Sequence, residues 1–158
     1  MANVKPIPEG YHSITPYLFL KNAAAAIEFY KNVFGATERF RMPGPDGSIM
    51  HAEMQFGDSV VMMADENPKV GALSPQSIGG SATLLMIYIP DVDGVVKKAV
   101  GAGAKVIREV KDQFYGDRSG SIVDPFGHLW SVATHIEDVA PEEMEKRAAA
   151  AMGQAAAG

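Results

Sequence analysis

The sequence predicts an α+β fold made of two βαβββ modules. Three observations lead to this prediction. A strand pattern, a helical pattern and three further strand patterns follow one another in the first half of the chain. The same order returns about 69 residues later. A segment rich in proline, glycine and serine separates the two halves.

The first module is expected over residues 13–65, after an N-terminal arm of residues 1–12. Residues 15–20 have the aromatic and aliphatic density of a strand. A helix should begin at Asn22 as its N-cap and end at Gly35, because apolar residues recur between them at steps of three and four. Strands are then expected over 37–42, 49–56 and 59–64, with a tight turn at Gly57-Asp58.

The second module is expected over residues 82–135, beyond a loop-like linker of residues 66–81. Its strands should cover 84–89, 105–110, 120–123 and 129–134, with a helix capped by Asp91. Two copies are too few for a solenoid, so two modules closing on each other fit better. Residues 136–158 should form a charged helix followed by a frayed or disordered alanine-rich tail from residue 148.

Composition narrows the function classes. The chain has no cysteine, which excludes disulfides, thiolate metal sites and a cysteine nucleophile. Its net charge is −5 and it has no long basic cluster, so neither nucleic acid nor an anionic membrane is the expected partner. Without a signal-like N-terminus or a run of about 18 apolar residues, we expect a cytoplasmic protein. Its expected partner is a small molecule or another protein.

Two stretches and the module repeat carry a resemblance to a known family. Residues 26–35 read AIEFYKNVFG and residues 124–132 read DPFGHLWSV. With the repeat, they resemble the vicinal oxygen chelate superfamily of glyoxalase I, extradiol dioxygenases and bleomycin-resistance proteins. The segments His51-Ala-Glu-Met54 and Tyr115-Gly-Asp-Arg118 are most similar to its PhnB-like branch. The resemblance implies a pair of half-barrels around a small-molecule cleft, and a homodimer.

The resemblance also implies four metal-ligand positions. They fall on Thr15, Met62, Leu84 and Ser131, none of which is a histidine or a carboxylate. A divalent ion needs nitrogen or charged oxygen ligands that converge on one point. No metal or other cofactor is therefore predicted. A rebuilt divalent metal site at His12, His51 and Glu53 stays an alternative.

The strand over residues 49–56 carries the leading polar candidates. A two-residue turn at Gly57-Asp58 pairs Glu53 with Met62 and puts His51 and Glu53 on one face. That face should look into the cleft, because a charged residue is rarely buried without a partner. Its members are His51, Glu53, Gln55, Val60 and Met62, while Ala52, Met54, Phe56, Val61 and Met63 should pack against a helix. His51 is a candidate general base that Glu53 orients, and the alternative is a hydrogen-bonded pair that only shapes the pocket.

Further ligand-binding candidates come from several strands. Aromatic and methionine side chains on the two module-opening strands suit a flat or apolar ligand, or else fill the space between two half-sheets. Arg118 is expected in a loop before the seventh strand, where it binds an anion or pairs with Asp117 or Asp124. His12, His128 and His135 are expected to be solvated residues at the ends of strands or turns. Trp130 is expected to be a core residue that faces a helix. The ligand-binding set is Tyr17, Phe19, Gln55, Met62, Met86, Tyr88, Tyr115, Arg118 and Ser131.

Three functions remain open from the sequence. The first is binding of a small organic molecule in a cleft without the usual metal quartet. The second is a lyase, isomerase or dioxygenase-like enzyme that uses His51 and Glu53, or a rebuilt divalent metal site. The third is a non-catalytic structural or regulatory dimer.

Overall fold

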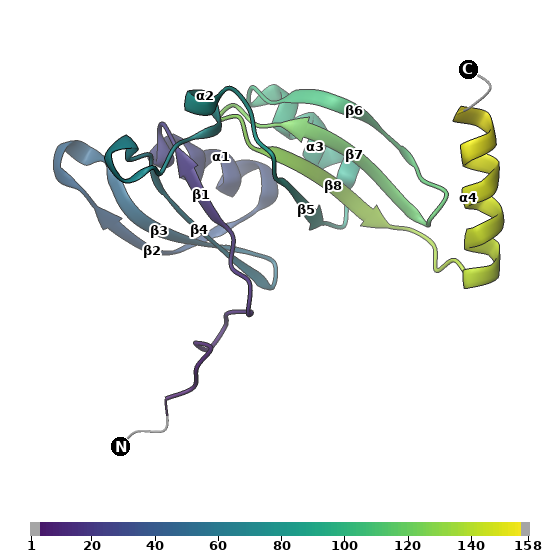
Figure 1. Ribbon diagram of the computed structural model, residues 1–158, viewed down its shortest axis with the longest axis horizontal. Coiled ribbons are helices and arrows are strands. Elements are labelled where there is room, and N and C mark those ends of the chain that lie inside the picture. Colours follow the sequence, from purple (N-terminus) through teal and green to yellow (C-terminus); the bar gives the residue numbers. More distant parts are fainter. Residues whose placement is uncertain (1–3, 156–158) are drawn as a thin grey trace. The chain divides into compact units, whose positions relative to one another are not determined.

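Two four-stranded sheets, one in each half of the chain, carry the fold (Figure 1). The computed structural model describes residues 4–155. The chain divides into unit 1, which runs to Ala82 and includes Phe126–His128, and unit 2, which comprises Thr83–Pro125 and the residues from Leu129 on. The predicted α+β architecture of two modules is confirmed. Within the described residues, no helix has the length and apolar character needed to span a membrane.

Unit 1 contains the first βαβββ module. Its strands are β1 (Tyr17–Leu20), β2 (Thr37–Pro43), β3 (Ile49–Phe56) and β4 (Ser59–Asp65), and the sheet order is β1-β4-β3-β2. The first strand lies parallel to β4, and the other two pairs are antiparallel. Helix α1 (Ala23–Phe34) contacts all four strands and covers one face of the sheet.

The ends of α1 follow from its sequence. The Asn22 side chain accepts a hydrogen bond from the Ala25 N–H at 3.0 Å, which satisfies one of the unpaired donors of the first turn. Gly35 ends the helix with φ of 67°, a left-handed conformation that glycine adopts without strain. Both predicted caps are confirmed.

The β3–β4 hairpin has the predicted register. Phe56 pairs with Ser59 and Glu53 pairs with Met62 across the Gly57-Asp58 turn. As expected, one face of the hairpin is buried, and it comprises Ala52, Met54, Phe56, Val61 and Met63. On the other face Val60 is also buried, while His51, Glu53, Gln55 and Met62 are partly exposed.

Unit 2 repeats the arrangement. Its strands are β5 (Leu84–Tyr88), β6 (Lys105–Asp112), β7 (Asp117–Val123) and β8 (Leu129–His135), in the order β5-β8-β7-β6, with α3 (Val92–Gly101) packed on β6, β7 and β8. The pairs Tyr17↔Met62 and Met86↔Ser131 are equivalent, since both members are displaced by 69 residues (86 − 17 and 131 − 62). The repeat read from the sequence is therefore a repeat of strand register.

Three sequence expectations need correction. The linker contains two short helical segments, η2 (Pro68–Val70) and α2 (Pro75–Ile78), each with a proline in its first turn and an N-capping Asn67 or Ser74. A further helical turn, η1 (Pro45–Gly47), lies between β2 and β3. Strand β7 begins at Asp117 rather than at residue 120.

The C-terminal tail also needs correction. Helix α4 (Pro141–Ala155) continues through the alanine-rich segment that was expected to be frayed. Alanine has the highest helix propensity, so a run of alanines extends a helix that has already started. The remainder of the tail, residues 156–158, lies outside the described residues.

Candidate functional site

The sheet of unit 1 has one face that α1 does not cover, and we call it the open face. Strand register aligns Tyr17 of β1 with Met62, Met62 with Glu53, and Glu53 with Phe40 of β2. Phe19 pairs with Ala64 one step along β1. The open face comprises Tyr17, Phe19, Phe40, His51, Glu53, Gln55, Met62 and Ala64.

A chain of polar contacts crosses the open face. The Tyr17 hydroxyl lies 2.8 Å from His51 Nδ1, and His51 Nε2 lies 3.3 Å from Glu53 Oε1. The Tyr11 hydroxyl, which comes from the N-terminal arm, donates to Glu53 Oε2. The side chains of His51 and Glu53 are 23% and 18% exposed, so both remain reachable from solvent. The predicted His51–Glu53 pair thus exists, and two tyrosines extend it.

The contacts determine where the protons lie. An ionised Glu53 can only accept, so His51 Nε2 must carry the hydrogen between them. In the neutral ring Nδ1 then has a lone pair, and it accepts from the Tyr17 hydroxyl. The lone pair of His51 Nδ1 therefore faces the Tyr17 hydroxyl.

Hydrogen bonds shift the pKa of Glu53, and burial shifts that of Tyr17. The hydrogen bond from Tyr11 lowers the pKa of Glu53, and the His51 contact lowers it further, against the opposing effect of burial. Burial raises the pKa of Tyr17, so its hydroxyl stays protonated around neutral pH. Glu53 is therefore the charged acceptor of the network, and Tyr17 is a neutral donor.

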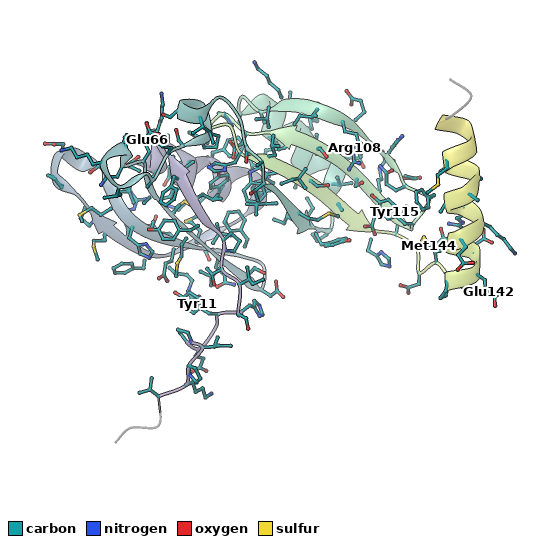
Figure 2. The ribbon with its side chains drawn as sticks, in the orientation of Figure 1. Tyr11, Glu66, Arg108, Tyr115, Glu142 and Met144 are labelled. Atoms are coloured by element: carbon teal, nitrogen blue, oxygen red, sulfur yellow. The ribbon has the colours of Figure 1, made fainter. Side chains whose placement is uncertain are left out.

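The N-terminal arm reaches the same face. Figure 2 shows Tyr11 where the arm meets unit 1. The Arg39 guanidinium carbon lies 4.9 Å from the centroid of the Tyr11 ring, and Arg39 also donates to Gln55 Oε1 at 3.3 Å. His12 donates from Nε2 to the Asp58 carbonyl at 3.2 Å. Neither Tyr11 nor Arg39 was among the predicted site residues.

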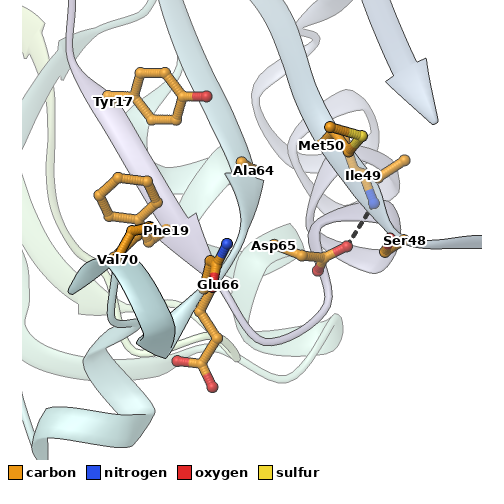
Figure 3. Close-up of a pocket in the computed structure, with 11 residues that line it drawn as sticks. Tyr17, Phe19, Ser48, Ile49, Met50, Ala64, Asp65, Glu66 and Val70 are labelled. Carbon is orange, nitrogen blue, oxygen red and sulfur yellow. Dashed lines mark hydrogen bonds between the residues drawn. The ribbon is translucent and has the colours of Figure 1, made fainter. Parts of the chain in front are cut away.

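A pocket of about 330 Å³ adjoins the network (Figure 3). The Tyr17 and Phe19 rings, with centroids 5.2 Å apart, line one side of it. Ile49 and Met50 lie on the other side, and Ala64 of β4 lies between them. Because alanine has only a methyl group at this position, the sheet is hollow there. The full lining is Tyr17, Phe19, Ser48, Ile49, Met50, Ala64, Asp65, Glu66, Asn67, Val70 and Ala72.

The two carboxylates of the pocket hold the fold together. Asp65 accepts from the backbone N–H of Ile49 at 2.6 Å and of Ala23 at 2.8 Å. Hydrogen bonds from the Ser74 side chain, the Ser74 N–H and the Ser77 hydroxyl lower the pKa of Glu66 to about 2. Both acids are occupied by the chain itself, so the ligand-facing part of the pocket is its aromatic and aliphatic wall.

The predicted ligand-binding residues of unit 2 differ in how exposed they are. Met86 and Tyr88 are exposed on β5, whereas Ser131 is only 4% exposed. Tyr115 is half-buried in the turn before β7 and packs edge-to-face on Phe114. Tyr88 donates to Asp117 Oδ2 at 2.9 Å, and this bond raises the pKa of its hydroxyl.

Arg118 is not in a loop. It lies within β7 and donates to Asp93 of α3 at 2.7 and 2.8 Å and to Asp112 of β6 at 2.8 Å. The expected partners Asp117 and Asp124 were therefore wrong. Two carboxylates raise the pKa of the Arg118 guanidinium, and they occupy the donors that an anionic ligand would need.

His128 is half-buried, whereas His135 is an exposed strand end as expected, and both have partners in the fold. His128 lies 3.0 Å from the Phe19 carbonyl through Nε2. His135 has Asp117 Oδ1 at 2.7 Å from Nδ1 and Asp138 Oδ1 at 2.9 Å from Nε2. The Asp117 bond, followed by the Asp138 bond, raises the pKa of His135. Trp130 is buried as expected and donates to Asp124 Oδ2 at 2.9 Å.

The residues do not fit the metal site that the superfamily resemblance implies. Thr15, Met62, Leu84 and Ser131 offer no imidazole and no carboxylate. Within residues 4–155, no three histidine, aspartate or glutamate side chains are grouped so as to hold a metal ion. We therefore derive no chemistry through a metal.

Comparison with known proteins identifies the family. A model of the Glyoxalase/Bleomycin resistance protein/Dioxygenase superfamily matches residues 10–132. The chain belongs to this superfamily. It is 36% identical over 146 residues to an uncharacterized protein of Mycobacterium bovis, covering 90% of this chain and 92% of the relative, and equally to two of Mycobacterium tuberculosis, of which it covers 82%.

Several solved structures share the fold. TioX of Micromonospora sp. ML1 is 24% identical with a TM-score of 0.62 over 79% of this chain and 99% of its own. An Arabidopsis thaliana gene product is 26% identical with the same TM-score, over 78% of this chain and 98% of its own. A PhnB protein of Bacillus cereus is 17% identical, also at 0.62, over 78% and 99%. These similarities establish the architecture of this superfamily member.

Proposed function

We propose that unit 1 binds a small, flat organic molecule in the hollow over Ala64, and that no metal ion takes part. The observation that carries the proposal is the double role of Tyr17. Its ring lines the pocket, and its hydroxyl begins the polar chain through His51 to Glu53. An apolar slot and a directional polar group therefore meet at one side chain, which is the usual composition of a small-molecule site.

The dimensions and the chemistry of the pocket support this ligand class. A volume of about 330 Å³ lies at the lower end of the range for ligand pockets, so the ligand is about the size of one or two fused rings. Tyr17 and Phe19 offer rigid aromatic surface, and Met50 and Met62 offer adaptable surface. The acids beside the slot are engaged with backbone amides, which favours a ligand with few charges.

The test uses chelator-treated protein and a panel of planar aromatic molecules. Ligands that bind should raise the melting temperature, because binding only the folded state stabilises it. Ala64→Leu should abolish the shift, since a larger side chain fills the hollow. Ala149→Leu makes the same change at an exposed position of α4 and should leave the shift intact. A panel without any shift, or equal shifts in Ala64→Leu, would refute the proposal.

A second candidate function is acid–base catalysis at His51, and the network geometry favours it. The ring is held between Tyr17 and Glu53, so its orientation and tautomer are fixed, as catalysis requires of a general base. His51→Gln retains a polar side chain but cannot act as a base near neutral pH. Turnover of a bound panel molecule that is lost in His51→Gln, with binding retained, would support catalysis; unchanged turnover would exclude it.

A further inference from the structure

The phenol ring of Tyr11 lies against the open face of unit 1. The side chain of Tyr11 is a phenol ring, and two groups of the sheet hold it. Glu53 accepts its hydroxyl hydrogen, and the Arg39 guanidinium lies over its ring at 4.9 Å from the centroid. These are the two contacts that a free phenol would need, a charged acceptor and a cation over the ring face.

The holding groups are fixed, whereas the arm that supplies Tyr11 is lightly attached. Arg39 and Glu53 stand on adjacent strands, and Arg39 is further bound to Gln55. Residues 4–10 of the arm are all exposed. Besides Tyr11, the arm is attached by the His12 contact to the Asp58 carbonyl. Releasing Tyr11 therefore exposes a carboxylate and a guanidinium that are already in position.

We propose that Tyr11 is a tethered stand-in for the ligand, and that the site takes a hydroxylated aromatic ring whose hydroxyl replaces that of Tyr11 on Glu53. This inference rests on the proposed function, because the same face carries both, and it names the ligand class. The charged acceptor sets the selectivity. A phenol hydroxyl can donate to Glu53, whereas the corresponding methyl ether has no hydrogen to donate and leaves the carboxylate unpaired.

The tether makes Tyr11 a competitor of the free ligand. A group held by a short flexible segment has an effective concentration of the order of millimolar, so a weak phenol must displace it to bind. If Tyr11 occupies the site about nine-tenths of the time, the apparent affinity of the free phenol falls about tenfold. Removing the side chain should restore that affinity.

The experiment uses the tyrosine side chain as a free molecule. Full-length protein is titrated with 4-methylphenol, and with 4-methylanisole as the matched ether, while amide NMR shifts of β2 and β3 are followed. Tyr11→Ala should lower the apparent Kd for 4-methylphenol about tenfold and leave 4-methylanisole binding weak. Tyr11→Phe, which frees Glu53 but keeps a ring in the arm, should give an intermediate value. Ile14→Ala, at an 85% exposed residue just after the arm, should behave as wild type.

The outcomes separate this inference from the proposed function. Equal Kd values for wild type and Tyr11→Ala, or equal binding of phenol and ether, would overturn the stand-in role. If planar molecules without a hydroxyl still bind in that case and Ala64→Leu still blocks them, the proposed function stands alone. If Ala64→Leu has no effect but the Tyr11 variants respond, the phenol site exists without the hollow. An unchanged fold in each variant is verified from its amide spectrum.

Discussion

Glu53 is the residue on which the polar chemistry of unit 1 converges. It accepts from Tyr11 through one carboxylate oxygen and from His51 through the other. A carboxylate that accepts on both oxygens stays ionised at a lower pH than a free one. Its charge in turn keeps the hydrogen on His51 Nε2 and leaves Nδ1 facing Tyr17. A change at Glu53 or at either donor should therefore be detected at the others.

The first prediction concerns this coupling. Tyr11→Phe removes the largest cause of the lowered pKa of Glu53, so that pKa should rise toward its ordinary value. The measurement is a pH titration of the Glu53 carboxyl carbon by NMR, with Glu9 as an internal reference on the arm. A Glu53 pKa that does not move in the variant would mean that the Tyr11 hydroxyl is not bound there in solution.

The sequence predicted part of this site. His51 and Glu53 were placed together because a two-residue turn at Gly57-Asp58 determines which residues of β3 share a face. Tyr11 was missed because it meets Glu53 across 42 positions of sequence, and the path of an arm without periodic structure is not encoded in any local pattern. A tyrosine beside a histidine, in an arm otherwise rich in proline and glycine, was the available signal.

At the level of elements, each module anchors the start of its helix to the end of its fourth strand. In unit 1 the Asp65 carboxylate accepts from the Ala23 N–H, and in unit 2 the Thr134 hydroxyl accepts from the Val92 N–H at 3.1 Å. The donors and the acceptors are both displaced by 69 residues (92 − 23 and 134 − 65). The same hydrogen bond between helix start and fourth strand therefore occurs at equivalent positions of both modules.

The second prediction tests this anchor. Asp65→Ala leaves the N–H groups of Ala23 and Ile49 without their acceptor, and each unpaired buried donor costs about 1–3 kcal/mol. The free energy of unfolding, measured in urea, should fall by at least the lower value. Asn22→Ala, which removes only the adjacent cap, should cost about 1 kcal/mol. A smaller loss in Asp65→Ala than in Asn22→Ala would contradict the anchoring role.

The elements that were predicted poorly share a cause. Strand β7 was predicted to start late because Asp117 and Arg118 are charged and were interpreted as loop residues. In the fold Asp117 pairs with His135, and Arg118 pairs with Asp93 and Asp112. Linker residues 66–81 read as loop because proline and serine mark both turns and helix starts. Long-range ion pairs stabilise the start of β7, and capping hydrogen bonds stabilise the short helices of the linker. Local composition does not reveal either kind of interaction.

At the level of the whole molecule, His135 gives stability a dependence on pH. Both of its ring nitrogens face carboxylate oxygens, which only accept, so the ring must carry both hydrogens and a positive charge. It joins the end of β8 to Asp117 of β7 and to Asp138 in the segment leading to α4. The raised pKa of His135 means that the folded state binds its proton more tightly than the unfolded chain does.

The third prediction follows from the sign of this shift. The stabilisation is fully present below about pH 6.5, the ordinary histidine value, and is lost as the pH rises through the raised pKa of the folded state. His135→Asn should therefore destabilise the protein more in acidic than in alkaline buffer. Urea unfolding of both proteins at two pH values measures this difference. An equal loss at both, or a larger loss in alkaline buffer, would show that His135 is not charged in the fold.

The order of elements was the most predictable property of the molecule. The repeat and the two capped helices follow patterns that local sequence records. The parallel pairing of β1 with β4 and of β5 with β8 was not predicted. The hollow over Ala64 was not predicted, because an alanine in a strand gives no sign that its neighbours in the sheet are aromatic. A pocket forms where a small side chain on one strand lies beside large side chains on its neighbours. Such neighbours can be identified only once the strand register is known.

The central claim is that unit 1 binds a flat organic ligand without a metal ion. The most direct measurement is the Kd of a planar phenol for Tyr11→Ala protein, determined once in excess chelator and once with added divalent metal, with NMR shifts locating the ligand. We expect equal Kd values and shifts confined to the open face of unit 1, from Ala64 and Tyr17 to His51 and Glu53. Binding that requires the metal, or shifts elsewhere in the chain, would contradict it.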